Sequence, residues 1–398
     1  MSTATDALLE TTRPGKESPE LSVVMPCLNE AETLRACIVK AKDALKAAAI
    51  SGEIIVADNG STDGSQEIAL DCGARVVEVK ERGYGSALQA GMAAARGKYM
   101  LMGDADESYD FSHIPRFLQE LRGGADLVMG NRFRGGIAKG AMPSLHRYLG
   151  TPVLTWIGRL FFKVPAGDIN CGMRAFTREA YEKMALRSTG MEFATEMLVK
   201  ASVLGMKVTE VPTTLSPDGR SRPPHLRTWR DGWRHLRFLL LYSPRWLFLY
   251  PGLLLMLLGS VVAGLLIRGP QRIGSVVFDV DTLVYATISI VLGFQVVTIA
   301  VFAKVFAVSE GLLPPDRKIE RFFSYANLEN GLVTGALIFI AGLALSVYAV
   351  GTWRAHHFGP MNSSQILRVT LPAAILMVLG LQISVASFFL SLLRLKRK

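Results

Sequence analysis

Long apolar runs dominate the second half of the chain. A helix needs about 20 apolar residues to cross a hydrocarbon core ~30 Å thick, and four uncharged runs reach that length. They are Trp246–Ile267, Thr282–Ala303, Gly331–Trp353 and Val369–Leu393. Burying four such helices in a soluble protein would need a shell of amphipathic elements, and the sequence leaves none. We therefore predict a four-helix transmembrane domain over 246–393, followed by a basic cytosolic tail at 394–398.

Short apolar runs alternate with helix-like stretches in the first half. The runs predict strands at Leu21–Met25, Glu53–Ala57, Arg75–Val79, Tyr99–Met102 and Asp126–Met129. The stretches between them predict helices, and this alternation is typical of an α/β fold with a doubly wound, mostly parallel sheet. We place this soluble domain at residues 21–225. The polar segment 1–20 predicts a flexible tail, and we expect no signal peptide in it.

Two stretches of mixed character lie close to the first span. Residues 146–162 combine an apolar face with Arg147 and Arg159, and residues 226–248 interleave arginines with tryptophans such as Trp229 and Trp233. Tryptophan and arginine at helical spacing favour the headgroup layer of a membrane. Surface helices packed on the soluble domain remain the alternative. We predict interfacial helices at about 146–162 and at 226–245.

Charge and cysteine content add the cellular setting. Of 398 residues half are hydrophobic, and the net charge is +10. Such a basic balance suits an anionic membrane surface and phosphate ligands, so we expect a lipid bilayer as partner and no nucleic acid. Basic residues gather before the first span, between the second and third, and after the fourth, which predicts a cytoplasmic soluble domain and C-terminus. The four cysteines lack CxxC spacing and predict reduced thiols.

Polar side chains follow four of the five predicted strands. Because ligands bind beyond the carboxyl ends of parallel strands, we expect these side chains to meet at one edge of the sheet. They are Asn29 and Glu30, Asp58, Asp104 and Asp106, and Asn131 and Arg132. This convergence predicts a ligand site at that edge.

Asp104-Ala105-Asp106 places two carboxylates in one turn. Neighbouring carboxylates repel each other, and hard divalent cations favour such oxygen ligands. An isolated DxD sequence is more often a solvated turn, but here it follows a strand and Asp58 follows another. We therefore predict that Asp104 and Asp106 hold Mg²⁺ or Mn²⁺, which bridges to a diphosphate.

Asp58 opens the sequence DNGSTDG, which is also a good turn former. At the sheet edge its carboxylate would accept hydrogen bonds from a base or a ribose. Asp63 would instead cap the helix that begins near Ser65. No GxGxxG or GKS pattern is present, so neither a Rossmann fingerprint nor a P-loop is predicted.

Six motifs in order resemble the polyprenyl-phosphate glycosyltransferases of family 2, the dolichol-phosphate mannose and glucose synthases and their bacterial relatives. They are PCLNEAETL (26–34), ADNGSTDGS (57–65), RGYGSALQAG (82–91), GDADESYDF (103–111), GNRF (130–133) and DINCGMRAF (168–176). The resemblance covers about residues 20–245. It implies a GT-A fold and inverting transfer of a sugar, a UDP-linked hexose by preference, from a nucleotide-diphosphate donor to a polyprenyl phosphate.

The resemblance also implies residue roles. Residues implied to line the nucleotide, the donor diphosphate or the loop closing over them are Pro26, Leu28, Glu30, Asp58, Asp104, Ala105, Arg174, Arg220 and Arg222. Arg132 and Arg147 would contact the lipid phosphate, unless they only anchor headgroups. Asp168, Glu192 and Glu196 would bind sugar hydroxyls or orient Arg174, or be purely structural. The chain departs from the family at Ser108, where a glutamine is common, and at Ser221-Arg222, where Ser-Lys is common.

The expected chemistry follows from the acceptor. A phosphate monoester is largely dianionic at neutral pH because its second pKa is about 6, so it needs no general base. The main task of the protein is then to hold the attacking phosphate in place, for which the forked guanidinium group of arginine is suited. We predict Asp106, Arg132, Arg147 and Asp168 as catalytic residues. Two alternatives stay open: a processive polysaccharide synthase, whose QxxRW motif is missing here, and a non-catalytic scaffold or flippase partner. The spans would tether, orient or oligomerise the enzyme.

Overall fold

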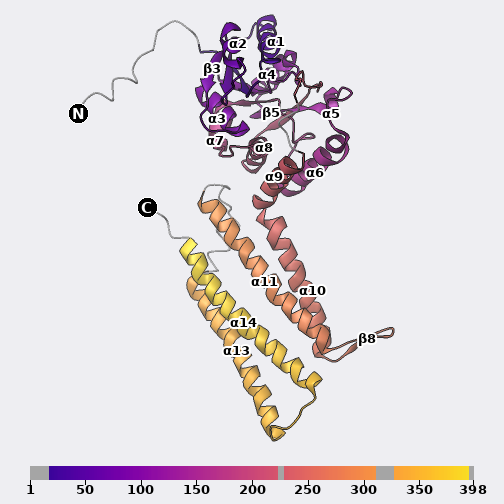
Figure 1. Ribbon diagram of the computed structural model, residues 1–398. Coiled ribbons are helices and arrows are strands. Elements are labelled where there is room, and N and C mark those ends of the chain that lie inside the picture. The colour runs from indigo at the N-terminus through magenta and orange to yellow at the C-terminus, as the bar shows by residue number, and fades with distance from the viewer. Residues whose placement is uncertain (1–17, 223–227, 311–326, 394–398) are drawn as a thin grey trace, which may run out of the picture. The chain divides into compact units, whose positions relative to one another are not determined.

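The computed structural model describes residues 18–222, 228–310 and 327–393. The chain forms two compact units, which divide after Leu239. The first unit consists of a sheet with surrounding helices, and the second of long helices (Figure 1). Residues 1–17 of the predicted tail at 1–20, the predicted tail at 394–398, and residues 226–227 of the second interfacial segment lie outside the described residues.

The first unit contains a seven-stranded sheet in the order β3-β2-β1-β4-β6-β5-β7. Its strands are β1 (Leu21–Cys27), β2 (Gly52–Asp58), β3 (Arg75–Glu78), β4 (Tyr99–Met102), β5 (Leu127–Asn131), β6 (Arg174–Thr177) and β7 (Val208–Pro212). All neighbouring strands are parallel except β6, which runs antiparallel to both β4 and β5. The predicted doubly wound, mostly parallel α/β sheet is therefore confirmed. The sequence pattern did not predict β6 and β7.

Helices cover both faces of this sheet. Alternate residues of β1 explain why: Leu21, Val23 and Met25 join the core beneath α1 (Leu34–Ala47) and α4 (Ile114–Arg122), whereas Val24 points to α3 (Tyr84–Ala94). Strands buried on both faces form near-continuous apolar runs, as β1 and β2 do. The remaining helices of the unit's sheet layers are α2 (Ser65–Asp71), α5 (Arg132–Gly135), α7 (Arg178–Met184) and α8 (Phe193–Val203).

Two further helices occupy the predicted interfacial segments. A π-helical turn, η3 (His146–Gly150), leads into α6 (Thr151–Phe162), and α9 (Thr228–Leu241) precedes a second such turn, η4 (Arg245–Leu249). Both helices expose large apolar side chains: Trp156 is 62% exposed and Trp229 is 81% exposed. Helices packed as surface elements on a soluble domain would bury such groups, so this exposure favours contact with lipid.

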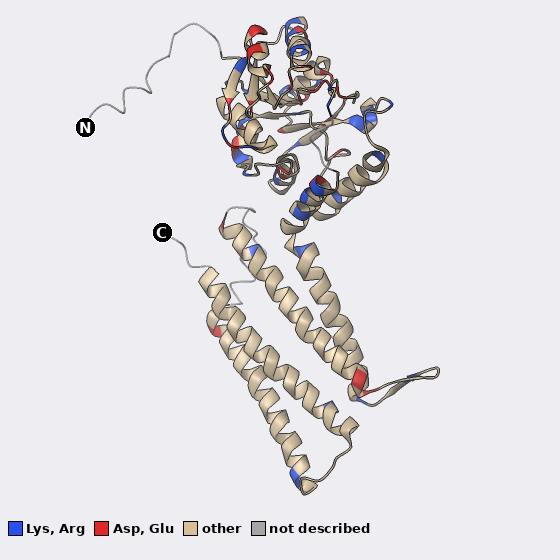
Figure 2. Cartoon of the chain, viewed as in Figure 1, with Lys and Arg blue, Asp and Glu red and all other residues tan. Residues whose placement is uncertain are grey.

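In the part of the second unit that the structure describes, four helices are long and apolar enough to cross a membrane, as predicted. They are α10 (Tyr250–Ile267), α11 (Val280–Ser309), α13 (Leu328–Ala355) and α14 (Ser363–Leu393). Charged residues lie at the helix ends, and the stretches between are free of them for most of their length (Figure 2). A short hairpin, β8 (Gln271–Ile273) and β9 (Val276–Phe278), connects α10 to α11 and was not predicted.

The four long helices pack as two hairpins with glycines at their contacts. A methyl group on Gly252 of α10 would lie 2.8 Å from the Gly293 carbonyl oxygen of α11, and one on Gly335 of α13 would lie 2.6 Å from that of Gly380 on α14. Small residues allow such close backbone approach, which drives helix association in lipid. Arg368 of α14 connects the hairpins by pairing with Asp279.

Candidate active site

Asp58 is the last residue of β2 and lies almost completely buried at the carboxyl end of the sheet. Its Oδ2 accepts hydrogen bonds from the backbone N–H groups of Gly60 and Ser61, both at 3.1 Å, and from Gln66 Nε2 at 2.6 Å. Its Oδ1 is equally buried but has no hydrogen-bond partner among the described residues. An unpaired buried oxygen is costly, so the Asp58 carboxylate keeps one acceptor that the described residues leave unsatisfied.

Asp63 stabilises the start of α2 from outside the helix. Its carboxylate accepts from the Ser65 N–H at 3.1 Å, the Ser65 hydroxyl at 2.6 Å and the Ala31 N–H at 2.9 Å. The N-cap position itself belongs to Gly64, whose φ of 88° is left-handed and suits glycine. Asp63 therefore accepts hydrogen bonds at the start of the helix as predicted, but it lies one residue before the N-cap position.

Asp104 and Asp106 follow β4. Tyr84, the first residue of α3, donates its hydroxyl to Asp104 Oδ1 at 3.0 Å, and the Ser108 N–H donates to Asp106 Oδ1 at 3.0 Å. Burial, and then the nearby Asp106 charge, raise the pKa of the Asp104 carboxyl to about 7. Among the described residues no three acidic, histidine or cysteine side chains cluster tightly enough to form a complete metal site. A cation held by these two aspartates would therefore take its remaining ligands from substrate and water.

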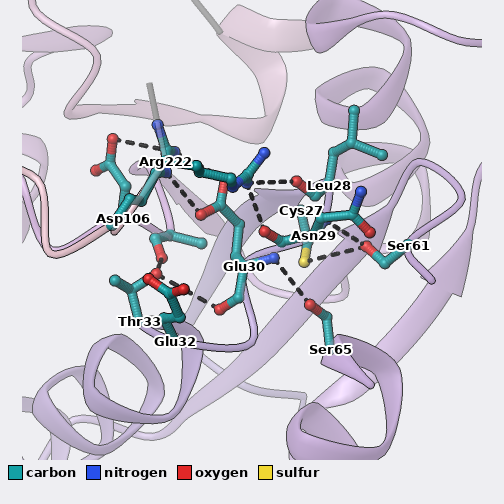
Figure 3. A network of polar contacts seen from close by, with 12 residues as sticks. Cys27, Leu28, Asn29, Glu30, Glu32, Thr33, Ser61, Ser65, Asp106 and Arg222 are labelled. Atoms are coloured by element: carbon teal, nitrogen blue, oxygen red, sulfur yellow. Dashed lines mark hydrogen bonds and ion pairs between the residues drawn. The ribbon is translucent and has the colours of Figure 1, made fainter. Parts of the chain in front are cut away.

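Glu30 brings two arginines of a distant loop to the same edge (Figure 3). Arg220 binds the Glu30 carboxylate with two hydrogen bonds of 2.7 Å, and it also reaches Asp106 Oδ2 at 3.2 Å. Arg222 donates to the backbone carbonyls of Leu28, at 2.9 Å, and of Asn29. Burial raises the pKa of Glu30, and the two guanidinium groups offset only part of that effect. The loop at 218–222 thus places the positive charge of Arg220 beside Asp106, in the acidic turn formed by Asp104-Ala105-Asp106.

A cavity of about 260 Å³ opens beside this loop. It is lined by Asn29, Glu30, Glu32, Thr62, Asp63, Arg220 and Arg222. The lining comes from the segments after β1 and β2 together with the 218–222 loop, so the cavity lies at the carboxyl ends of the strands, where doubly wound sheets bind ligands.

Arg132 and Asp168 form a buried pair. Arg132 Nε and Nη2 donate to the two Asp168 oxygens at 2.6 and 2.8 Å, and the Arg132 N–H donates to Oδ2 at 3.3 Å. Asp168 is fully buried and Arg132 is 8% exposed. Asp168 therefore orients Arg132 instead of Arg174, and its oxygens are occupied by the arginine.

Of three further predicted residues, Arg174 does not have the surroundings expected of it, whereas Glu196 fits the structural alternative. Arg174 is fully buried and donates to the carbonyls of Cys171, Ile169 and Ala194, so it has no path to a nucleotide. Glu196 is also fully buried, where it pairs with Lys200 at 2.8 Å and accepts N–H groups from the 187–188 loop. Among the described residues, neither Glu196 nor Glu192 forms a hydrogen bond or an ion pair with Arg174. The prediction for Arg174 was wrong because tertiary burial, and not sequence position, decides what a charged side chain can reach.

Four other predicted residues are placed as follows. Pro26 lies within β1, beside Ala57 of β2, and Leu28 contributes its carbonyl to Arg222. Ala105 is buried, and its carbonyl accepts the Thr33 hydroxyl at 2.7 Å, so any role is through its backbone. Arg147 lies on η3, with its guanidinium 5.6 Å from the Tyr148 ring centre. Among the described residues, Arg147 makes no hydrogen bond or ion pair with the Asp104-Ala105-Asp106 turn.

Sequence reasoning missed Tyr84 and Asn59. Tyr84 orients the Asp104 carboxylate from the RGYG motif, and Asn59 uses its amide to hold the carbonyls of Val79 and Glu81 and the N–H of Gly83. Asn59 thereby fixes the segment that carries Tyr84. The only signal in the sequence was the position of Tyr84 at the start of a helix that follows a strand.

Comparison with known proteins agrees with this arrangement. Residues 22–185 match the family described as glycosyl transferase family 2, and residues 301–394 match the family 2 C-terminal transmembrane region. The low-salt glycan biosynthesis hexosyltransferase Agl6 of Haloferax volcanii is 37% identical over 375 residues, covering 94% of this chain and 89% of that protein. The dolichyl-phosphate hexose transferase of the same organism is 31% identical over 196 residues, covering 48% and 81% respectively.

Among solved structures, glucosyl-3-phosphoglycerate synthase of Mycobacterium tuberculosis aligns with a TM-score of 0.44 and 23% identity, covering 56% of this chain and 79% of that one. Together with the family matches, the acidic sheet edge and the four spans define a glycosyltransferase of the multi-pass membrane class. The chain belongs to glycosyltransferase family 2. The resemblance drawn from the six motifs is therefore confirmed.

Proposed function

We propose that this enzyme transfers a hexose from a UDP-linked donor to a polyprenyl phosphate at the cytoplasmic face of the membrane. The observation that carries the proposal is the acidic edge formed by Asp58, Asp104 and Asp106 at the ends of two parallel strands. The named activities of the relatives, a hexosyltransferase and a dolichyl-phosphate hexose transferase, support the sugar class and the lipid acceptor.

The nucleotide would bind against Asp58. Its unpaired Oδ1 is an acceptor that lacks a donor, and the imide N–H of uracil or a ribose hydroxyl supplies one. The neighbouring cavity would hold the rest of the nucleoside, with the Arg220 and Arg222 loop lying over it. We assign Glu30 the role of fixing that loop through its paired hydrogen bonds with Arg220.

Asp104 and Asp106 would hold the divalent cation. Their carboxylates are the hard oxygen ligands that Mg²⁺ and Mn²⁺ prefer, and Asp104 lies so close to Gly172 that a methyl group there would approach its Oδ2 to 2.6 Å. The bound cation supplies charge neutralisation at the departing diphosphate. Tyr84 keeps the Asp104 carboxylate in a single orientation, and Arg220 adds a positive charge beside Asp106.

Arg132 and Arg147 would receive the acceptor phosphate. Asp168 holds Arg132 through Nε and Nη2, which leaves the Nη1 edge of the guanidinium for a phosphate oxygen. The acceptor's dianionic phosphate needs no base, so Asp168 would act by positioning Arg132. The exposed tryptophans of α6 and α9 would keep the unit at the headgroup layer, where that phosphate lies.

The test is transfer by purified full-length protein in vesicles containing undecaprenyl phosphate. Each common UDP- or GDP-sugar is supplied in labelled form, with Mn²⁺ or with EDTA. We expect one lipid-linked monosaccharide that forms only with the cation. Long polymer formed without lipid phosphate would instead identify a processive polysaccharide synthase, and no product with any donor would support a non-catalytic membrane module.

Asp106→Asn provides the residue-level check. Loss of one ligand charge should lower transfer by more than about a hundredfold, since disturbing even outer-shell partners of a metal costs about 10- to 100-fold. The control is Asp71→Asn, whose exposed side chain makes only a 3.9 Å pair with Arg35. Asp106→Asn with full activity would remove Asp106 from the cation site.

A further inference from the structure

The two membrane hairpins repeat each other. In each hairpin the first helix has two glycines seven residues apart, and the second helix has an alanine and then a glycine at the same spacing. The matched positions are Gly252, Gly259, Ala286 and Gly293 in α10–α11, and Gly335, Gly342, Ala373 and Gly380 in α13–α14. The contacts repeat as well: a methyl group on Gly259 would lie 2.6 Å from the Ala286 oxygen, and one on Gly342 would lie 2.7 Å from the Ala373 oxygen.

The returning helices also share a sequence around the second glycine. Residues 291–295 read VLGFQ in α11, and residues 378–382 read VLGLQ in α14. Each hairpin therefore carries a glutamine, Gln295 or Gln382, at the same place in its second helix. Phe302 and Phe389, each seven residues further on, contact each other with ring centres 4.6 Å apart. The equivalent helices of the repeat thus pack directly against one another.

The two glutamines have different surroundings. Gln382 is partly buried, and its Oε1 is covered by protein without accepting a hydrogen bond from any described residue. Gln295 is exposed at the middle of the 30-residue helix α11, and it has no hydrogen bond to any residue that the structure describes. In a hydrocarbon core no water satisfies an amide, so an exposed glutamine at that depth needs a polar partner.

Gln295 lies in the centre of a regular apolar stripe. The exposed large side chains of α11 are three or four residues apart, or a multiple of that spacing, and Gln295 fills the position between Leu292 and Ile299. We define the Gln295 stripe as Tyr285, Ile288, Leu292, Gln295, Ile299 and Phe306. Phe302 holds the heptad position between Ile299 and Phe306, where it is partly buried against Phe389 of the same chain, so the stripe is open to a partner on the side of Gln295 and Leu292. This heptad spacing is the pattern of a coiled-coil seam, in which one central polar residue fixes register and partner number.

We propose that the Gln295 stripe is the surface on which a second copy of this chain docks within the membrane, α11 against α11. Two copies inserted in the same direction place their Gln295 side chains opposite each other. Each amide has both a donor and an acceptor, so the pair satisfies itself, which a lipid tail cannot do. The equivalent stripe around Gln382 is already partly covered by protein within the chain, which shows that this face of the repeat is suited to helix packing.

The test measures self-association of the full-length protein in lipid vesicles. Donor- and acceptor-labelled copies are mixed over a range of lipid-to-protein ratios, and energy transfer gives the dimer dissociation constant. Gln295→Leu should raise that constant roughly threefold to twentyfold, the effect of one interhelical hydrogen bond in lipid. Gln295→Asn, which keeps the amide, should restore most of the affinity. Gln382→Leu is the matched control and should leave the constant unchanged.

Cross-linking gives a second measurement that does not depend on affinity. In a Cys72→Ser background treated with a copper–phenanthroline oxidant, Ile299→Cys should form a disulfide-linked dimer, whereas Leu337→Cys on α13, which is more exposed (63% against 46%), should not. A monomer at every lipid ratio, an unchanged constant for Gln295→Leu, or equal cross-linking at both positions would each overturn the proposal. The outcome is independent of which donor or acceptor the enzyme uses.

Discussion

Asp104 has the most unusual environment of the acidic residues at the site. Burial and the adjacent Asp106 raise its pKa to about 7, so near neutral pH a proton competes with a cation for the carboxylate. We predict that Mn²⁺ affinity in the presence of UDP rises about tenfold per pH unit below pH 7 and levels off above it. Electron paramagnetic resonance of free Mn²⁺ measures this directly. A flat profile between pH 5.5 and 7 would contradict the assignment of Asp104 as a cation ligand.

Tyr84 offers a sharper test of the same carboxylate. Its hydroxyl donates to Asp104 Oδ1 and stabilises the charged form, so Tyr84→Phe should raise the pKa of Asp104 further. Mn²⁺ affinity at pH 7 should then fall about 10- to 100-fold, as for other outer-shell partners, and recover as the pH is raised. Tyr181→Phe, on a tyrosine whose ring stacks on Phe176, is the control and should leave the profile unchanged. Loss of affinity that does not recover at high pH would indicate a merely structural role.

The sequence predicted those site residues that stand directly at the end of an apolar strand, because the strand end fixes the edge of the sheet at which they lie. Asp58, Asp104 and Asp106 end apolar strands, so periodicity already brings them to one edge. Tyr84 and Asn59 could not be found this way, because their partners lie about 20 residues away and depend on how α3 meets the sheet. The burial of Arg174 was likewise invisible, since a charged residue is rarely expected to be fully buried.

At the scale of elements, Asp168 joins the start of α5 to the segment that precedes β6. Asp168→Asn would leave the buried Arg132 charge without its partner, so we predict a loss of about 3–5 kcal/mol in the free energy of unfolding of the first unit. Glu20→Gln removes the carboxylate of a largely exposed pair with Arg122 and should cost less than about 1 kcal/mol.

The thiols provide the measurement for that comparison. Cys27, Cys37 and Cys171 are buried in the first unit, so a thiol-reactive fluorophore reports when this unit unfolds, whatever the state of the membrane helices. An Asp168→Asn variant that melts at the temperature of the unmodified protein would show that the pair does not stabilise the unit.

The strands differ in how far the sequence predicted them. β1 to β5 are apolar runs with helices between them, the pattern of a doubly wound sheet. β6 is only four residues long and begins with the buried Arg174, and it inserts antiparallel between two strands that precede it in sequence. Neither its short length nor its charge indicates a central strand; the surrounding core determines its position. The four membrane helices were the simplest to predict, because length and absence of charge suffice.

At the scale of the whole molecule, the distribution of basic residues predicts which side of the membrane each unit faces. The β8–β9 hairpin follows the first span, so it should lie outside the cytoplasm if the first unit lies inside. In a Cys72→Ser background, Val277→Cys, 57% exposed, should react with an impermeant maleimide in intact spheroplasts. The unmodified chain should react at Cys72 only in inverted vesicles. The reverse pattern would place the site on the opposite side.

The glycine contacts also bear on how the membrane unit is made. Each hairpin brings its own two helices together through backbone contacts that need nothing from the other hairpin. A nascent chain leaving the translocon can therefore release α10 and α11 as a finished pair before α13 has been synthesised. If the membrane unit assembles in these two steps, the last step is the association of the two hairpins. The ion pair between Arg368 and Asp279 then holds the second hairpin against the first.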